Sequence, residues 1–133
     1  QIKKNETTFL FKSHNPKYKD GEQKRDFIYV KDCIDILLWF VEKNKFSGIF
    51  NVGTGQSRTF NDLINNVYYN MKKNINLKYI DMPNSIKKQY QYETKADTKN
   101  LEKLGYKKKL FTLEEGISDY INTYLEKINY AIS

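Results

Sequence analysis

The chain is organised around the segment Lys24-Arg25-Asp26-Phe27-Ile28-Tyr29-Val30-Lys31-Asp32. Its alternating apolar and aromatic residues predict a short strand, and Asp32 stands where a helix N-cap is expected, before the apolar run 33–41. An arginine at the mouth of such a strand-to-helix unit is well placed to bind an anion, because its guanidinium forks onto phosphate oxygens. The spacing alone leaves open the alternative that Arg25 and Asp26 form a surface ion pair.

Length and composition limit the class of protein. The chain has 133 residues, enough for one domain with a modest core. It contains no apolar run near the ~20 residues of a membrane span and no signal-peptide core, and it begins at Gln1, as a fragment or a processed chain would. One cysteine and one histidine exclude a disulfide framework and a zinc cluster. A single thiol also fits a reducing cytoplasm.

The formal charge of +7 raises the possibility of a nucleic-acid-binding module. The lysines are dispersed along the chain, however, and are mixed with 16 acidic residues. We therefore favour a solvated lysine-rich surface, or a basic cleft mouth that attracts an anionic ligand, over nucleic-acid binding.

The first half of the chain predicts a β–α–β unit. A strand is expected at 8–12 and a polar loop at 12–24. The strand that begins near Lys24, a helix at 32–44 and a second strand at 48–52 then form the unit, which gives a parallel pair of strands. The apolar stripe of the helix comprises Cys33, Ile36, Leu37, Phe40 and Val41, and further apolar residues lie on its other side. Such a helix is buried on more than one face or packs against something that the chain lacks.

Two patterns in the middle of the chain imitate cofactor motifs. Gly53-Thr54-Gly55-Gln56-Ser57-Arg58 follows a strand, but Arg58 occupies the place of the third glycine of a dinucleotide turn, so a tight turn is the better interpretation. Thr59 and Asp62 then resemble a capping box. The pairs Tyr68–Lys72 and Tyr69–Lys73 match the Tyr-x-x-x-Lys catalytic pattern of short-chain dehydrogenases, and we reject them because no cofactor fold accompanies them.

The second half predicts a strand at 76–80 and an aromatic segment at 86–94, in which Tyr90 and Tyr92 share a face if the segment is extended. A short helix at 96–104 ends at Gly105, and a Thr112–Glu115 capping box opens the last helix. The residues that we expect this last helix to bury are Leu113, Ile117, Tyr120, Ile121, Tyr124 and Ile128.

The sequences of several of these segments resemble one enzyme family. The motif at 25–32 is similar to the segment that opens the substrate half of extended short-chain dehydrogenase/reductase sugar-nucleotide enzymes. Within that superfamily, the chain is most similar to the ADP-glyceromanno-heptose 6-epimerases. The segments that support this resemblance are Leu-Trp-Phe at 38–40, Ser-Gly-Ile-Phe-Asn-Val-Gly-Thr-Gly at 47–55, Tyr-Gln-Tyr-Glu-Thr at 90–94 and Leu-Gly-Tyr at 104–106.

The resemblance implies an α/β fold with a small parallel sheet and flanking helices, in which residues 1–133 form a single substrate-binding domain. This domain would be the C-terminal part of a longer enzyme whose dinucleotide-binding Rossmann part is absent from the chain. The substrate-binding residues that the resemblance implies are Phe11, Lys12, Ser13, His14, Arg25 and Tyr90. Ser13 replaces the usual glycine of its turn, and the insertion 15–23 lengthens the loop.

The resemblance also implies the chemistry. NADP, bound by the missing N-terminal part, would serve the epimerisation of ADP-glycero-manno-heptose at C6″, from D-glycero to L-glycero, for the lipopolysaccharide core. The catalytic and cofactor-binding residues would all precede Gln1, no metal would be needed, and this chain alone would be inactive. The expected partners are an ADP-sugar, the missing Rossmann half and further copies in a homo-oligomer, with neither nucleic acid nor membrane. Another NDP-sugar epimerase or dehydratase, and a pure interaction domain, remain alternatives.

Overall fold

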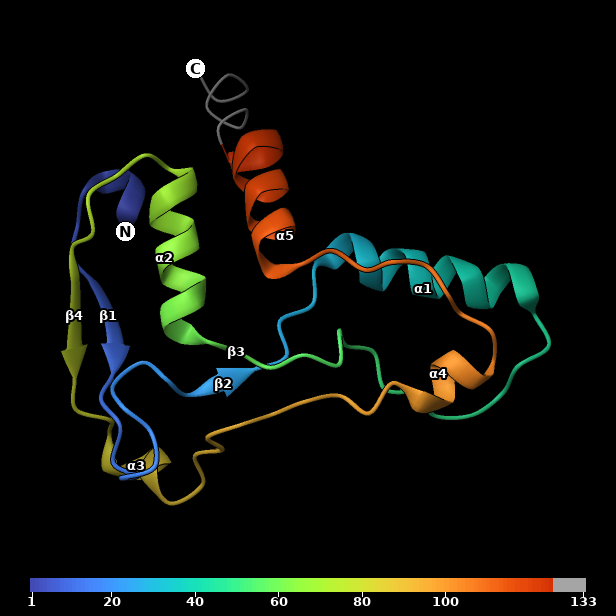
Figure 1. The fold of residues 1–133 in the computed structure, drawn as a ribbon, viewed down its shortest axis with the longest axis horizontal. Helices are drawn as coiled ribbons and strands as arrows, with labels where there is room; N and C mark the ends of the chain where they lie inside the picture. The colour runs from blue at the N-terminus through green and yellow to red at the C-terminus, as the bar shows by residue number, and fades with distance from the viewer. Residues whose placement is uncertain (126–133) are drawn as a thin grey trace.

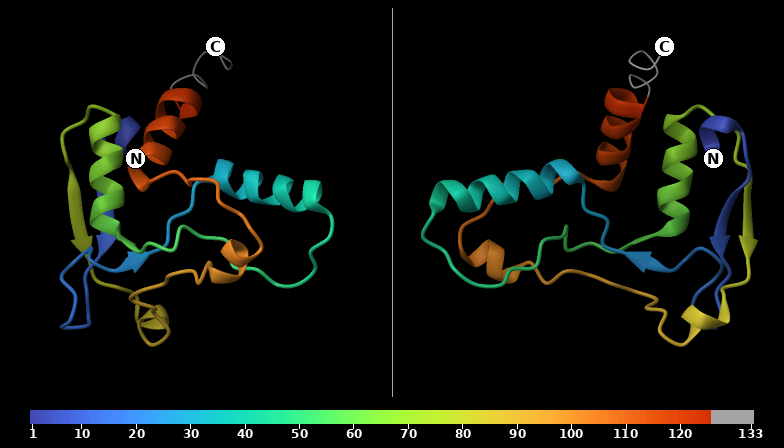
Figure 2. Two further views of the ribbon diagram at one scale, coloured as in Figure 1. Left: turned by 45° about the vertical axis from the view of Figure 1, so that its right-hand side comes forward. Right: turned by 180° about the vertical axis from the view of Figure 1, so that it is seen from behind.

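A computed structural model of the chain describes residues 1–125 (Figure 1). The elements in chain order are η1 (Ile2–Lys4), β1 (Thr8–Phe11), β2 (Lys24–Arg25), α1 (Val30–Lys43), β3 (Arg58–Thr59), α2 (Phe60–Asn70), β4 (Leu77–Ile80), α3 (Asn84–Lys87), α4 (Lys99–Lys103), α5 (Leu113–Tyr120) and the π-helical turn η2 (Ile121–Leu125). β1, β4 and α2 lie at one end of the molecule, α1 and α4 lie at the other, and α5 stands between α2 and α1 (Figures 1 and 2).

Two small sheets join segments that are far apart in the sequence. β1 and β4 pair in parallel, with Thr8 opposite Leu77 and Phe11 opposite Ile80. β2 and β3 pair antiparallel, with Arg25 opposite Arg58. The predicted strands at 8–12 and 76–80 and the α/β class with a small parallel sheet are confirmed. The predicted strand that starts at Lys24 is shorter than expected, because its ladder covers only Lys24–Arg25.

The predicted strand at 48–52 is wrong. This stretch has no ladder partner among residues 1–125, and Ile49 is 95% exposed. A strand exists only through hydrogen bonds to a neighbour, and the described part of the chain offers none here. The parallel pair therefore forms between β1 and β4 rather than across α1.

The predicted role of Asp32 is also wrong. The N-cap of α1 is Tyr29, and Asp32 lies inside the first turn. Its side chain is 1% exposed, and it accepts a hydrogen bond of 3.0 Å from the backbone N–H of Phe111. Asp32 thus anchors the chain that leads into α5 instead of capping its own helix.

Helix α1 is buried on only one side. Ile36 is completely buried against Leu101 and Tyr106, and these three residues form the core of this end of the molecule. Two members of the predicted buried stripe, Leu37 and Val41, are instead exposed. The apolar residues of α1 that face outward are Val30, Ile34, Leu37, Leu38 and Val41.

The helix ends follow the sequence signals more closely. Both predicted capping boxes are present, since Thr59 pairs with Asp62 and Thr112 with Glu115. Gly105 has a φ of +98° after α4, as the prediction required. Ile121 is buried as expected.

Some details of the last helices differ from expectation. Tyr120 and Tyr124 are exposed rather than buried, and α4 is shorter than the predicted 96–104. Ile128 lies outside the described residues. Over residues 1–125, no helix is long and apolar enough to cross a membrane.

Candidate functional site

Three of the predicted site residues meet in one cavity at the carboxyl ends of β1 and β2. The cavity has a volume of about 320 Å³. It is lined by Phe9, Leu10, Phe11, Gln23, Arg25, Phe60 and Tyr90. The fold therefore brings Phe11, Arg25 and Tyr90 together from three distant segments.

The guanidinium of Arg25 lies between two aromatic rings. Its Cζ is 5.7 Å from the centre of the Phe60 ring and 5.2 Å from that of Tyr90, and Nη1 donates a hydrogen bond of 2.6 Å to the carbonyl of Lys24. Aromatic faces attract the cation without neutralising it. Among residues 1–125, no carboxylate forms an ion pair with Arg25, so its charge is available to an anionic ligand.

The alternative ion pair between Arg25 and Asp26 is wrong, because the Asp26 carboxylate faces the glycine turn. It accepts hydrogen bonds from the backbone N–H and hydroxyl of Thr54, at 2.8 and 2.5 Å. It also accepts from the N–H groups of Gly55 and Ala96, at 2.9 and 3.0 Å. Burial alone would raise the pKa of Asp26, but these hydrogen bonds together hold it below its ordinary value.

The geometry of this turn does not fit a dinucleotide. The N–H groups of Thr54 and Gly55, which would have to face a pyrophosphate, already donate to a carboxylate. A Cβ on Gly53 would lie 2.4 Å from Ala96 and 2.8 Å from Asp26, so the glycine is required by internal packing. Gly55 has a φ of +70°, as a tight turn predicts.

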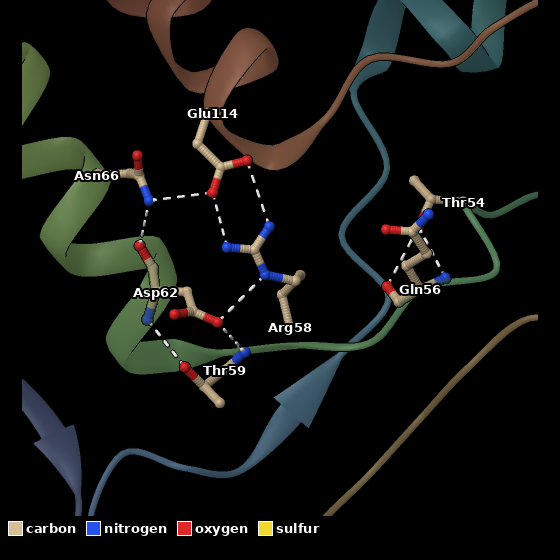
Figure 3. Close-up of polar contacts among 7 residues, drawn as sticks. All are labelled: Thr54, Gln56, Arg58, Thr59, Asp62, Asn66 and Glu114. Atoms are coloured by element: carbon tan, nitrogen blue, oxygen red, sulfur yellow. Dashed lines mark hydrogen bonds and ion pairs between the residues drawn. The ribbon is translucent and has the colours of Figure 1, made fainter.

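Arg58, at the position of the missing third glycine, joins two helices (Figure 3). Its Nη2 lies 2.6 Å from Oε1 of Glu114, and its Nε lies 3.2 Å from Oδ2 of Asp62. These contacts raise the pKa of Arg58, chiefly through the hydrogen bond that its guanidinium donates to Glu114. The role of Arg58 is structural, and its charge is already balanced.

Ser13 and His14 lie beside the cavity rather than in its lining. The N–H of Ser13 donates to Asp20 at 2.7 Å, and the N–H of His14 donates to the hydroxyl of Tyr92 at 2.8 Å. The ring of His14 is 6.5 Å from that of Tyr90, edge to face. Lys12 is turned toward Asp81, with Nζ 3.3 Å from Oδ1, and it does not line the cavity.

The predicted site does not include four of the cavity residues, which are Phe9, Leu10, Gln23 and Phe60, or the neighbouring Tyr92. Gln23 is 1% exposed and donates to the carbonyl of Phe11 at 3.1 Å. It precedes Arg25 by two residues, so the period of a strand could have placed it on the same face. Phe60 carried no such signal. The resemblance implies Tyr90 and not Tyr92, although their rings are 5.4 Å apart.

The tyrosine–lysine patterns are not catalytic pairs in this fold. Tyr68 is buried, and its hydroxyl contacts Thr8 at 2.9 Å and the carbonyl of Asn76 at 2.8 Å. Helix α2 ends at Asn70, and Lys72 has a φ of +52°. The lysines therefore do not continue the helical face that the pattern needs.

Comparisons with known proteins show which enzymes this chain is similar to. The model of the NAD dependent epimerase/dehydratase family matches residues 1–53. A Fusobacterium nucleatum protein named ADP-L-glycero-D-manno-heptose-6-epimerase is 43% identical over 96% of the chain and 40% of its own length. A Nitratidesulfovibrio vulgaris protein of the same name is 42% identical over 87% of the chain and 36% of its own length. The chain thus spans about 40% of the length of these curated relatives.

Solved structures of two sugar-nucleotide epimerases are also similar to the chain. The ADP-L-glycero-D-manno-heptose-6-epimerase of Helicobacter pylori matches 87% of this chain and 32% of its own, with 29% identity and a TM-score of 0.67. The UDP-N-acetylglucosamine 4-epimerase of Methanobrevibacter ruminantium, solved with UDP-N-acetylmuramic acid, matches 95% of this chain and 37% of its own. Its identity is 25% and its TM-score 0.75. The chain is thus similar, at 29–43% identity, to part of proteins named ADP-L-glycero-D-manno-heptose-6-epimerase, and its residues 1–53 match the NAD dependent epimerase/dehydratase family model.

Proposed function

We propose that this chain is the sugar-nucleotide-binding part of an ADP-glycero-manno-heptose 6-epimerase. The complete enzyme would convert the D-glycero epimer into the L-glycero epimer at C6″ for the lipopolysaccharide core. Relatives of that name, 42–43% identical over most of the chain, support this proposal over other nucleotide-sugar enzymes.

The observation that carries the proposal is the position of Arg25. Its guanidinium opens onto a cavity of about 320 Å³ with aromatic walls and has no acidic partner among residues 1–125. A guanidinium binds a diphosphate through parallel charge-assisted hydrogen bonds. The ring of Tyr90 and the side chain of Phe11 supply apolar surface for the rest of a nucleotide sugar, and Ser13 and His14 lie beside the same cavity.

The redox chemistry belongs outside this chain under the proposal. NADP supplies the removal and return of hydride in such reactions when it is bound, and the glycine turn at 53–58 does not fit it. The residues of this chain would bind the sugar nucleotide, orient it and hold its diphosphate in place.

The exposed apolar surface of α1 is evidence that another part of the same enzyme packs against this helix. Its exposed apolar residues are Val30, Ile34, Leu37, Leu38 and Val41. An apolar helix face of this kind is typical of a surface that another part of the protein covers. We propose that the cofactor-binding Rossmann half covers this surface and that the complete enzyme is a homo-oligomer.

The direct test is turnover by the complete protein. With NADP bound, we expect ADP-D-glycero-manno-heptose to be converted to a mixture of its two C6″ epimers, as followed by proton NMR. The isolated 133-residue chain is the control and should show no turnover. Conversion of a UDP- or dTDP-sugar but not of the ADP-heptose would favour another NDP-sugar enzyme. Tight, steeply salt-dependent binding of DNA without sugar-nucleotide binding would favour the nucleic-acid alternative.

A further inference from the structure

Tyr92 connects the walls of the site. Its backbone carbonyl accepts the N–H of Lys24 at 2.8 Å, directly before Arg25. Its ring is 5.2 Å from that of His14 and 4.9 Å from that of Tyr18, on the loop between β1 and β2. Tyr92 thus touches the segment that carries Arg25, the ring of Tyr90 and the loop that carries His14.

The hydroxyl of Tyr92 makes two contacts with His14. It accepts the backbone N–H at 2.8 Å and lies 2.9 Å from Nδ1 of the ring. A third contact, with Oγ of Ser13, is longer, at 3.4 Å. Oγ of Ser13 in turn donates its own proton to the carbonyl of Asn15 at 2.8 Å.

These distances favour one placement of the protons. A tyrosine hydroxyl has one proton to donate, and Nδ1 of His14 is the nearer acceptor. If Nδ1 carried the ring proton instead, the 3.4 Å contact to Ser13 would be the one acceptor left for the hydroxyl proton within residues 1–125. The arrangement with two short hydrogen bonds is therefore favoured, and it leaves the ring proton of His14 on Nε2. Among residues 1–125, Nε2 has no hydrogen-bond partner.

We propose that Tyr92 is a positioning residue that fixes the tautomer of His14, so that the Nε2–H group of His14 donates to an acceptor oxygen of the bound sugar nucleotide. This inference rests on the proposed function, because it takes the ligand to be the one held by Arg25 and Tyr90. The imidazole of His14 is already oriented edge to face against Tyr90 at 6.5 Å. A donor held in place before binding loses less rotational freedom when the ligand arrives.

The test measures the tautomer and the affinity separately. His14 is the single histidine of this chain, and in the complete enzyme labelled with ¹⁵N-histidine its signals are assigned by comparison with His14→Ala. At about pH 8.5, where free imidazole is neutral, we expect the Nε2–H tautomer. Tyr92→Phe should shift His14 toward a mixture of tautomers. The same variant should weaken ADP-heptose binding by about threefold to tenfold and leave NADP binding unchanged.

Two controls separate positioning from general damage. Tyr18→Phe makes the same chemical change in a ring that touches Tyr92, but no hydrogen bond of the Tyr18 hydroxyl is present within residues 1–125, so neither readout should move. In the His14→Ala background, Tyr92→Phe should cause little further loss of affinity, because the two residues act through one hydrogen bond to the ligand.

The outcomes are distinct. A wild-type His14 with its proton on Nδ1, or a tautomer unchanged in Tyr92→Phe, overturns the role of Tyr92. An altered tautomer with undiminished ADP-heptose affinity overturns the donation to ligand. If the unsubstituted enzyme binds no ADP-heptose, the proposed function fails, and the ¹⁵N spectra still decide whether Tyr92 fixes His14.

Discussion

The guanidinium of Arg58 forks onto the carboxylate of Glu114, with Nη2 2.6 Å from Oε1 and Nη1 3.3 Å from Oε2. Asp62, in the first turn of α2, accepts from Nε of the same guanidinium, and Glu114 lies in the first turn of α5. Arg58 therefore links the N-termini of two helices, where carboxylates are favoured by the helix dipoles. The antiparallel pairing of β2 with β3 places Arg25 opposite this link.

Loss of this link should lower stability modestly. We expect Arg58→Met to reduce the free energy of unfolding by about 1 kcal/mol, because the pair is bidentate but partly exposed to water. Lys99→Met, which removes a longer and more exposed contact with Asp97, is the matched control and should change nothing measurable. Chemical denaturation of both variants checks this, and equal midpoints would show that the Arg58 link contributes no stability.

The same pair predicts a response to acid. The hydrogen bond from Arg58 is the main cause that lowers the pKa of Glu114 from its ordinary value of 4.5. A depressed folded pKa gives stability that is present above the unfolded value and is lost as the pH falls through the folded value. In Arg58→Met, the free energy of unfolding should therefore fall less steeply with pH below about pH 4.5. Near neutral pH, its dependence on pH should match that of the unsubstituted chain. A full acid slope in the variant would contradict this origin.

Asp26 should be more costly to replace than other carboxylates near the site. It accepts four hydrogen bonds that hold the glycine turn and the segment at Ala96, and asparagine would present an amide N–H₂ to some of these donors. We expect Asp26→Asn to destabilise by about 2 kcal/mol or more. Asp81→Asn removes only the exposed contact with Lys12 and serves as the control. Thermal unfolding compares the two, and similar melting temperatures would rule out the anchoring role.

Local signals in the sequence predicted local features well. The capping boxes at Thr59 and Thr112 and the turn glycine Gly105 depend on residues within a few positions of one another. The strand at 48–52 failed, because the pattern of a strand says nothing of whether a neighbour is present to complete its hydrogen bonds. Asp32 failed for a similar reason, since its partner Phe111 is distant in the chain.

The candidate site likewise contains features that the sequence predicted and long-range contacts that it did not. The resemblance picked out Phe11, Arg25 and Tyr90, and the fold brings them together in one cavity. Nothing in the sequence pattern could reveal that Tyr92 meets His14 across 78 positions. Contacts of that range depend on the whole path of the chain, and residue spacing carries no record of it.

The apolar face of α1 should be detectable in the isolated chain. We expect the 133-residue chain to bind a hydrophobic dye, because Leu37 and Val41 are exposed and Val41 is 72% accessible. Leu37→Lys together with Val41→Lys should reduce dye binding without unfolding the isolated chain, whereas Ile36→Lys places a charge in the core and should unfold it. In the complete enzyme the double substitution should destabilise. Unchanged stability there would mean that nothing covers this face.

The proposed sugar-nucleotide site depends most on Arg25, and Arg25→Lys is the most informative substitution to compare with Arg25→Ala. A charge-assisted fork onto phosphate contributes about 1.5–3 kcal/mol, so Arg25→Ala should weaken ADP-heptose binding by about tenfold to a hundredfold. Arg25→Lys should recover only part of the loss, because a point charge replaces a planar fork. Arg58→Ala is a control for the loss of an arginine outside the cavity and should leave the ADP-heptose affinity nearly unchanged.

The role of Arg25 is tested most directly by calorimetric titration of the complete enzyme with ADP-heptose and, separately, with NADP. The melting temperature of each variant is measured as a control for folding. The predicted result is a loss of ADP-heptose affinity in Arg25→Ala, with unchanged NADP affinity and an unchanged melting temperature. Undiminished ADP-heptose binding, or the loss of both ligands together with the fold, would show that Arg25 is a structural residue and that the sugar nucleotide binds elsewhere.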